Sequence, residues 1–174
     1  MNSAARLAVL ALACALVPAA PAAAAEDYPR LRPGLWEVSS RTSAQAKDAP
    51  AARSTMCLDE ATARDMYRFS QGMMEGMCSK FEVKHSGNRY TSEAVCKLGD
   101  SRMTAHSTMT LSGDTAYRIE GRSTYDPPFM GMKDATTTVE ARHAGPCRPG
   151  QKPGDITTAG GQTINIRNLN PAGK

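Results

Sequence analysis

Three tight turns constrain the fold of this chain most, because they divide the stretch from Phe81 to Tyr125 into four expected strands. The turns are Ser86-Gly87-Asn88, Gly99-Asp100 and Ser112-Gly113-Asp114-Thr115. Glycine next to aspartate or asparagine supplies the positive φ angles that short hairpin turns require. The sequence therefore predicts an antiparallel meander.

The lengths of these turns also predict how residues pair across the meander. Counting from the turn Gly99-Asp100 places these residues opposite each other: Cys96 and Met103, Ala94 and Ala105, Ser92 and Ser107, Tyr90 and Met109. Counting from the turn Gly113-Asp114-Thr115 places these opposite each other: Leu111 and Tyr117, Met109 and Ile119, Ser107 and Gly121. The two registers agree on which side chains share a face.

Alternation along the strand after Gly99-Asp100 predicts one dry and one wet face of the sheet. The expected inner face carries Met103, Ala105, Met109 and Leu111. The expected outer face carries polar side chains, namely Arg102, Thr104, His106, Thr108 and Thr110. We therefore expect a sheet that buries one side only.

A band of small residues crosses the middle of the expected inner face: Ser92, Ala94, Ala105, Ser107, Gly121 and Ser123. A helix packed over this band is one interpretation, because a one-faced sheet must bury that face against another element. A groove for an apolar ligand is the other, since small-molecule sites are concave and mostly apolar. The candidate ligand-facing residues are Ser92, Ala94, Ala105, Ser107 and Gly121.

The first 25 residues have the pattern of a secretory signal peptide, with cleavage expected after Ala25. Arg6 provides a basic flank, and the apolar run from Leu7 to Val17 is shorter than the roughly 20 residues that span a bilayer. Cys14 does not sit in a regular lipoprotein cleavage box, so we expect no lipid anchor. The sequence predicts an exported chain without a transmembrane segment.

Removing this signal from 174 residues leaves 149, which suits one domain, expected over residues 26–147. The formal net charge falls from +4 to +3 with the loss of Arg6. Nucleic-acid binding is not expected, because no basic cluster contains interleaved aromatic residues. From Arg148 onward the chain is rich in Pro, Gly, Gln and Asn, so we expect residues 148–174 to be a disordered tail.

The segments around the meander predict five further features. Pro33–Val38 is an expected strand with Trp36 in the core, followed by an exposed loop or ragged strand over Ser39–Thr55. A helix is expected from Leu58 to about Phe69, because it would have acidic residues in its first turn, where the helix dipole stabilises negative charge. This helix is the candidate cover for the small residues. The two remaining expectations are an ordered loop over Tyr125–Met132, which contains two prolines, and a last strand over Ala135–His143.

Four cysteines remain after the signal is removed, which in an exported protein predicts two disulfides with three possible connectivities. Cys78 and Cys96 each lie nine residues from Gly87, at the open end of a hairpin, so we expect them to pair, leaving Cys57 to pair with Cys147. Placing Phe81 on the inner face sets Cys96 opposite the neighbouring Ser79, so the bridge requires a bulge or an irregular strand entry. No Cys/His spacing typical of zinc is present, and no metal site is expected.

Nine methionines remain after the signal, several of them in expected loops: Met73, Met74, Met77, Met130 and Met132. Thioethers select Cu(I), so copper handling is an alternative function. The plainer interpretation is that methionine fills irregular gaps in a core with few aromatic residues. No catalytic or cofactor motif occurs, so we expect neither an enzyme nor a cofactor, and His106 is expected to be solvated.

An ordered set of short motifs runs through the chain: Pro33-Gly34-Leu35-Trp36-Glu37, Met56-Cys57-Leu58, two middle cysteines, Gly131-Met132 and Gly145-Pro146-Cys147. With its signal peptide, the chain resembles the exported bacterial domain-of-unknown-function family 3617 (DUF3617), over about Arg32 to Cys147. The resemblance implies a periplasmic location in a Gram-negative cell. It implies no activity, because the family has none to carry over.

These observations predict a mainly β fold, a curved antiparallel meander of about six strands, half-barrel-like, with one short helix on its concave face. The expected function is non-enzymatic binding of an apolar small molecule or an envelope partner on that face. The alternatives are copper handling by the methionines and an envelope protein that makes only protein–protein contacts.

Overall fold

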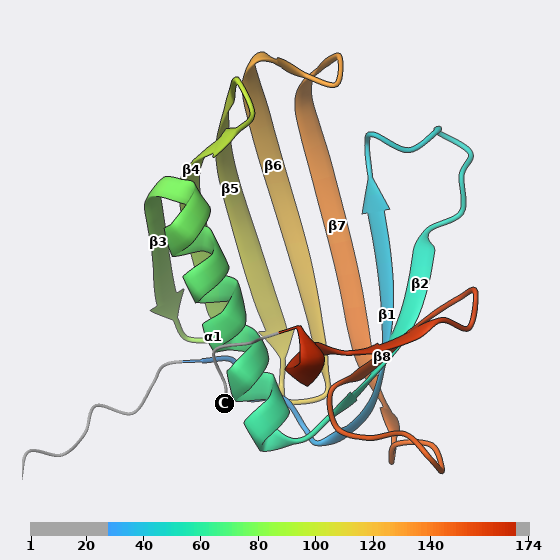
Figure 1. Cartoon of the computed structure of the whole chain (residues 1–174). Coiled ribbons are helices and arrows are strands. Elements are labelled where there is room, and N and C mark those ends of the chain that lie inside the picture. The colour runs from blue at the N-terminus through green and yellow to red at the C-terminus, as the bar shows by residue number, and fades with distance from the viewer. Residues whose placement is uncertain (1–27, 170–174) are drawn as a thin grey trace, which may run out of the picture.

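The computed structural model describes residues 28–169, so the expected signal peptide over residues 1–25, with Cys14, lies outside the described residues. The described part contains nine strands and one α-helix (Figure 1). Their bounds are β1 Gly34–Thr42, β2 Ala52–Leu58, α1 Glu60–Met77, β3 Cys78–Ser86, β4 Arg89–Leu98, β5 Ser101–Ser112, β6 Ala116–Phe129, β7 Met132–Gly145, β8 Asp155–Thr158 and β9 Thr163–Asn165, followed by a 3-10 turn, η1, Ile166–Asn168.

All strands belong to one antiparallel sheet in the order β3-β4-β5-β6-β7-β1-β2-β8-β9, which does not close into a barrel. The mainly β fold with one helix is therefore confirmed. Figure 1 shows the sheet curling so that β8 and η1 come round to the face on which α1 lies. We call this the inner face, and the opposite one the outer face.

The meander formed by β3, β4, β5 and β6 has the predicted registers. Ala94 pairs with Ala105 across β4 and β5, and Ser107 pairs with Gly121 across β5 and β6. Gly87, Gly99 and Gly113 occupy the three turns with φ angles of 62°, 59° and 62°. The turn residues therefore determine the pairing because only their conformation closes these hairpins without strain.

The expected count of about six strands is wrong, because β2, β8 and β9 add to it. Part of the segment Ser39–Thr55, expected to be a loop or ragged strand, forms a hairpin with β1, in which Trp36 pairs with Met56. Residues 155–165 of the expected disordered tail form β8 and β9 instead. These strands hold few apolar residues, but Ile156 pairs with Met56 and thereby extends an existing sheet edge.

Helix α1 is longer than expected, since it continues past Phe69 to Met77. Its N-terminus matches the expectation, because the Asp59 carboxylate caps it and accepts a hydrogen bond of 2.7 Å from the Thr62 backbone N–H. The helix packs against β3 and β4 and also contacts η1. No helix of residues 28–169 combines the length and apolarity that a membrane crossing needs.

The expected loop over Tyr125–Met132 is also wrong, since β6 runs to Phe129 and only Met130-Gly131 turns the chain. The two prolines are tolerated for a local reason. The last pair that β6 makes with β5 is Asp126 with Arg102, and its ladder with β7 is interrupted between Thr124 and Phe129. Pro127 and Pro128 therefore occupy positions where no ladder hydrogen bond is required. Strand β7 is longer than the expected Ala135–His143 and is followed by β8 and β9.

The core lies where β1, β2 and β7 meet the first half of α1. Trp36, fully buried, packs with Met56, Leu58 and Ala141, and Met66 of α1 contacts this cluster. The Trp36 indole donates a hydrogen bond of 2.9 Å to the Arg32 carbonyl oxygen. The expectation that Trp36 is a core residue is confirmed.

Both expected disulfides are present, Cys78–Cys96 and Cys57–Cys147. Phe81 pairs with Ala94 and Lys80 with Val95, but Cys78 pairs with Cys96, so the register shifts between Cys78 and Lys80. This irregularity is the bulge that the sequence required. The second bridge ties the end of β7 to β2, across the intervening β1.

Candidate functional site

The predicted band of small residues lies on the inner face, with its members in register across β4, β5 and β6. Ala94 is buried at 6% exposure, whereas Ser92, Ala105, Ser107 and Gly121 are only partly buried. The Ser92 and Ser107 hydroxyls share a hydrogen bond of 2.7 Å. The band is therefore assembled as predicted, with satisfied hydroxyls that present little polarity.

Helix α1 covers this band unevenly, because it packs mainly on β3 and β4 and, through Met66, on the core cluster of β1, β2 and β7. Further across the inner face, Met109, Ile119 and Val139 form a row of paired apolar residues that remain partly exposed. A Cβ atom built on Gly121 would meet only ordinary contacts, the nearest being the Ser107 Cβ at 3.6 Å. The inner face therefore has an apolar, shallow middle.

The inner face becomes fully packed only toward the core. There the Tyr117 ring packs against Trp36 in a tilted arrangement, with ring centroids 5.7 Å apart, and burial raises the pKa of the Tyr117 hydroxyl. The apolar middle of the inner face is thus bounded by the Tyr117 and Trp36 side chains toward β1 and by α1 toward β4.

Four of the five methionines considered for copper do not lie in the expected loops: Met73, Met74 and Met77 belong to α1, and Met132 begins β7. In α1, Met73 and Met77 are 42% and 45% exposed, and Met130 is 84% exposed at the β6–β7 turn. Among residues 28–169 there is no group of three or more His, Cys, Asp or Glu side chains that could hold a metal ion. His106 is exposed on the outer face, 4.0 Å from Glu93, as expected of a solvated side chain.

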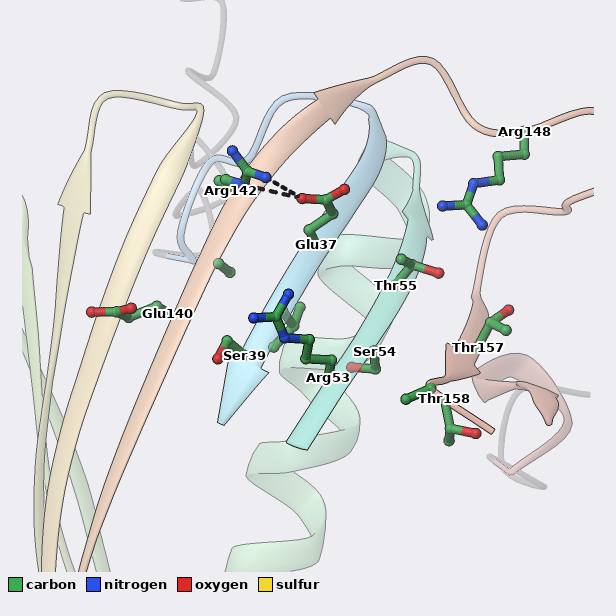
Figure 2. A pocket seen from close by; sticks show the side chains of 13 residues that line it. Glu37, Ser39, Arg53, Ser54, Thr55, Glu140, Arg142, Arg148, Thr157 and Thr158 are labelled. Carbon is green, nitrogen blue, oxygen red and sulfur yellow. Dashed lines mark hydrogen bonds and ion pairs between the residues drawn. The ribbon is translucent and has the colours of Figure 1, made fainter. Parts of the chain in front are cut away.

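The outer face carries a groove that sequence reasoning missed. Its volume is about 700 Å³, and it crosses β7, β1, β2 and β8 on the side away from α1 (Figure 2). The polar residues that line it are Glu37, Ser39, Arg53, Ser54, Thr55, Glu140, Arg142, Arg148, Thr157 and Thr158. We call it the outer groove.

Charge in the outer groove is partly compensated within the protein. The Arg142 guanidinium donates hydrogen bonds of 2.6 Å and 3.0 Å to the Glu37 carboxylate, and Glu140 is paired with Arg118. The guanidinium groups of Arg53 and Arg148 make no hydrogen bond or ion pair with any residue of the described chain. The groove therefore has an excess of positive charge.

The residues that line this groove come from five separated segments of the sequence. Strand alternation places Glu37 and Ser39 on one face of β1, but most of β2 was expected only as a loop or ragged strand, and β8 falls in the expected disordered tail. Arg148 comes into the groove because the preceding Cys147 is bonded to Cys57 of β2. No local motif marks a site built in this way.

Comparison with known proteins gives one result. Residues 31–147 match the family described as "Protein of unknown function (DUF3617)". No curated protein and no solved structure shows a significant match. The matched region contains β1 to β7 and both disulfides, and it ends at Cys147, before Arg148 and β8. Because the match covers well over half of the chain, this protein belongs to the DUF3617 family.

Proposed function

We propose that this protein is an exported, non-enzymatic binding protein whose inner sheet face receives an apolar small molecule. The observation that carries the proposal is the partly exposed apolar row of Met109, Ile119 and Val139 beside the small-residue band. Apolar side chains on the inner face of a one-faced sheet are normally covered, because burial stabilises them by about 25 cal/mol per Å². A bound apolar molecule supplies that cover.

The shape of this surface favours a small occupant over a protein segment. Gly121 leaves room above the sheet, α1 bounds the surface on one side, and Tyr117 and Trp36 bound it on another. A surface with few polar groups that is bounded in this way matches the usual lining of small-molecule sites. An envelope protein partner, and copper bound through methionines, are the alternatives that the experiments below distinguish.

Export to the periplasm is part of the same proposal. The N-terminal 25 residues have the signal-peptide pattern, and two disulfides form in the structure. Disulfides persist in oxidising compartments and are rare in the cytosol. A fusion of residues 1–25 to a periplasmic reporter enzyme tests this point, with export expected and retention in the cytosol contradicting it.

Filling the recess tests the binding site directly. Replacing Gly121 by Leu places an apolar side chain where the ligand is proposed to lie, while the strand backbone there has an ordinary conformation. We expect Gly121→Leu to weaken binding of N-phenyl-1-naphthylamine, an apolar fluorescent probe, by at least about tenfold, measured by fluorescence titration.

The matched control is Thr108→Leu on the adjacent strand β5, which adds the same side chain to the outer face. It should leave probe binding within about twofold of the wild type. Equal probe binding by the wild type and Gly121→Leu would contradict the proposal, as would a wild type that binds no probe.

A further inference from the structure

We infer that the outer groove is a binding site for a phosphate group carried by a larger polar molecule. The inference is independent of the proposed function, because the outer groove lies on the opposite side of the sheet from the inner face (Figure 2). Its volume of about 700 Å³ is in the range of small-molecule sites, roughly 300–1,000 Å³. That space is far larger than a bare phosphate ion needs.

Cationic groups surround the groove from separate elements. Figure 2 shows Arg142 on β7, Arg53 on β2 and Arg148 on the segment after β7, with β1 running between them. Arg142 is neutralised by Glu37, whereas Arg53 and Arg148 have no anionic partner among the described residues. Two guanidinium groups are thus available to an incoming anion.

Hydroxyl groups complete the lining between these arginines. Thr55 and Thr157 pair with each other across β2 and β8, and Ser39 lies on the same face of β1, opposite Arg53. The Thr55 hydroxyl oxygen is enclosed and has no hydrogen-bond partner within the described chain, which is an unfavourable state for a polar atom. When the Thr55 side chain rotates toward the groove, its hydroxyl can donate a hydrogen bond to a ligand oxygen that the guanidinium groups hold. This hydrogen bond removes the cost of the unpaired hydroxyl.

This donor set suits phosphate better than carboxylate. A carboxylate has two coplanar oxygens, which one guanidinium fork already occupies. A phosphate monoester has three exposed oxygens and a phosphate diester has two, in a tetrahedral arrangement that is not confined to the plane of one guanidinium, so either can accept hydrogen bonds from arginines on different sides together with hydroxyl donors. The polar walls of the groove then contact the rest of a phosphorylated molecule, such as a sugar phosphate or a phospholipid head group.

The position of Arg148 depends on the part of the chain beyond the family match. Residues 148–169 cross to the β2 edge and add β8, which supplies Thr157 and Thr158 to the groove. The Gly154 backbone N–H donates a hydrogen bond of 2.8 Å to the Cys57 carbonyl oxygen and anchors this crossing. The groove is therefore assembled by the C-terminal segment on the DUF3617 domain.

Calorimetric titration of the disulfide-bonded protein at low ionic strength tests the inference, with glucose 1-phosphate and inorganic phosphate as phosphate probes and acetate as the carboxylate probe. We expect glucose 1-phosphate to bind more tightly than acetate. Arg53→Gln and Arg148→Gln should each weaken this binding by at least about tenfold, because each removes a charge-assisted hydrogen bond. Rising salt should weaken it further.

Two variants keep the test specific. Arg122→Gln removes the same charge from the outer face of β6, outside the groove, and should change the affinity by less than about twofold. Glu37→Gln releases the Arg142 guanidinium and should strengthen phosphate binding severalfold, a result that a damaged fold would not give.

Sedimentation with vesicles of phosphatidylcholine, with and without phosphatidylglycerol, distinguishes the two sources of the phosphate. Binding of glucose 1-phosphate that depends on Arg53 and Arg148 supports a free phosphorylated ligand. Binding only to phosphatidylglycerol vesicles with the same dependence supports a lipid head group. Three results would overturn the inference. They are an equal loss of affinity for glucose 1-phosphate in Arg53→Gln, Arg148→Gln and Arg122→Gln, tighter binding of acetate than of glucose 1-phosphate, and no binding to any phosphate probe.

Discussion

At the scale of single residues, the motif Pro33-Gly34-Leu35-Trp36-Glu37 has a physical role at nearly every position. Gly34 has a φ of 134° and lies against the end of β7, Trp36 fills the core, and Glu37 pairs with Arg142. The Pro33 carbonyl oxygen lies 3.0 Å from the His143 ring nitrogen Nε2. The motif therefore fixes the contact between β1 and β7.

Gly34→Ala should destabilise the protein severely. The new Cβ atom would overlap the Gly145 carbonyl oxygen and the His143 ring, in a backbone conformation that side chains disfavour. We expect the free energy of unfolding to fall by about 3 kcal/mol or more, measured by urea denaturation followed by circular dichroism.

Gly87→Ala is the control for this substitution. Gly87 also has a positive φ, 62°, but no atom lies within 4 Å of a Cβ built there. It should cost only about 1 to 2 kcal/mol. If both variants lost the same stability, the close approach of β1 and β7 at Gly34 would be refuted.

At the scale of elements, α1 shows where local propensity is overridden. Gly72 and Gly76 favour an earlier helix end, because glycine costs about 1 kcal/mol relative to alanine in a helix. The helix nevertheless reaches Met77, since Cys78 follows directly and is bonded to Cys96, and since Met74 is partly buried. A covalent tie to a neighbouring strand is not visible in helix propensity.

The double substitution of Gly72 and Gly76 by Ala should stabilise the protein. No atom lies within 4 Å of a Cβ atom at either position, so alanine adds helix propensity without a clash. We expect the free energy of unfolding to rise by about 2 kcal/mol in the same denaturation assay. A loss of stability would mean that α1 is not continuous through these residues.

Prediction from sequence succeeded for elements whose geometry is set locally and failed for those that depend on distant partners. Turn glycines determined the registers of β3 to β6, down to Ser107 opposite Gly121. In contrast, the first half of β2 and most of β8 are polar, and both segments are strands because each adds to a sheet edge that already exists. The outer groove depends on both, so it could not be predicted.

At the scale of the whole molecule, the two disulfides act on different parts of the sheet. Cys78–Cys96 closes a loop of 18 residues at the β3 edge, and Cys57–Cys147 closes one of 90 residues that joins β7 to β2. Even cysteine number and hairpin spacing sufficed to predict both pairs. Their spatial consequence, the placement of Arg148 over β2, required the structure.

Removing each disulfide by a pair of alanine substitutions should give unequal losses. In the loop-entropy model, loss of Cys57–Cys147 costs about 4.5 kcal/mol and loss of Cys78–Cys96 about 3 kcal/mol, measured by urea denaturation. The first variant should also lose affinity for glucose 1-phosphate, because Arg148 is released, whereas the second should keep it. The opposite order of effects would contradict the role given to the Cys57–Cys147 bridge.

The proposed function rests on the inner face being covered by an apolar molecule, and native mass spectrometry of the protein purified without detergent from the producing cells tests this most directly. We predict that the wild type carries an adduct of a small apolar molecule, and that Gly121→Leu lacks it while keeping both disulfides. A wild type without an adduct, a copper adduct in its place, or an adduct that persists in Gly121→Leu would contradict the account.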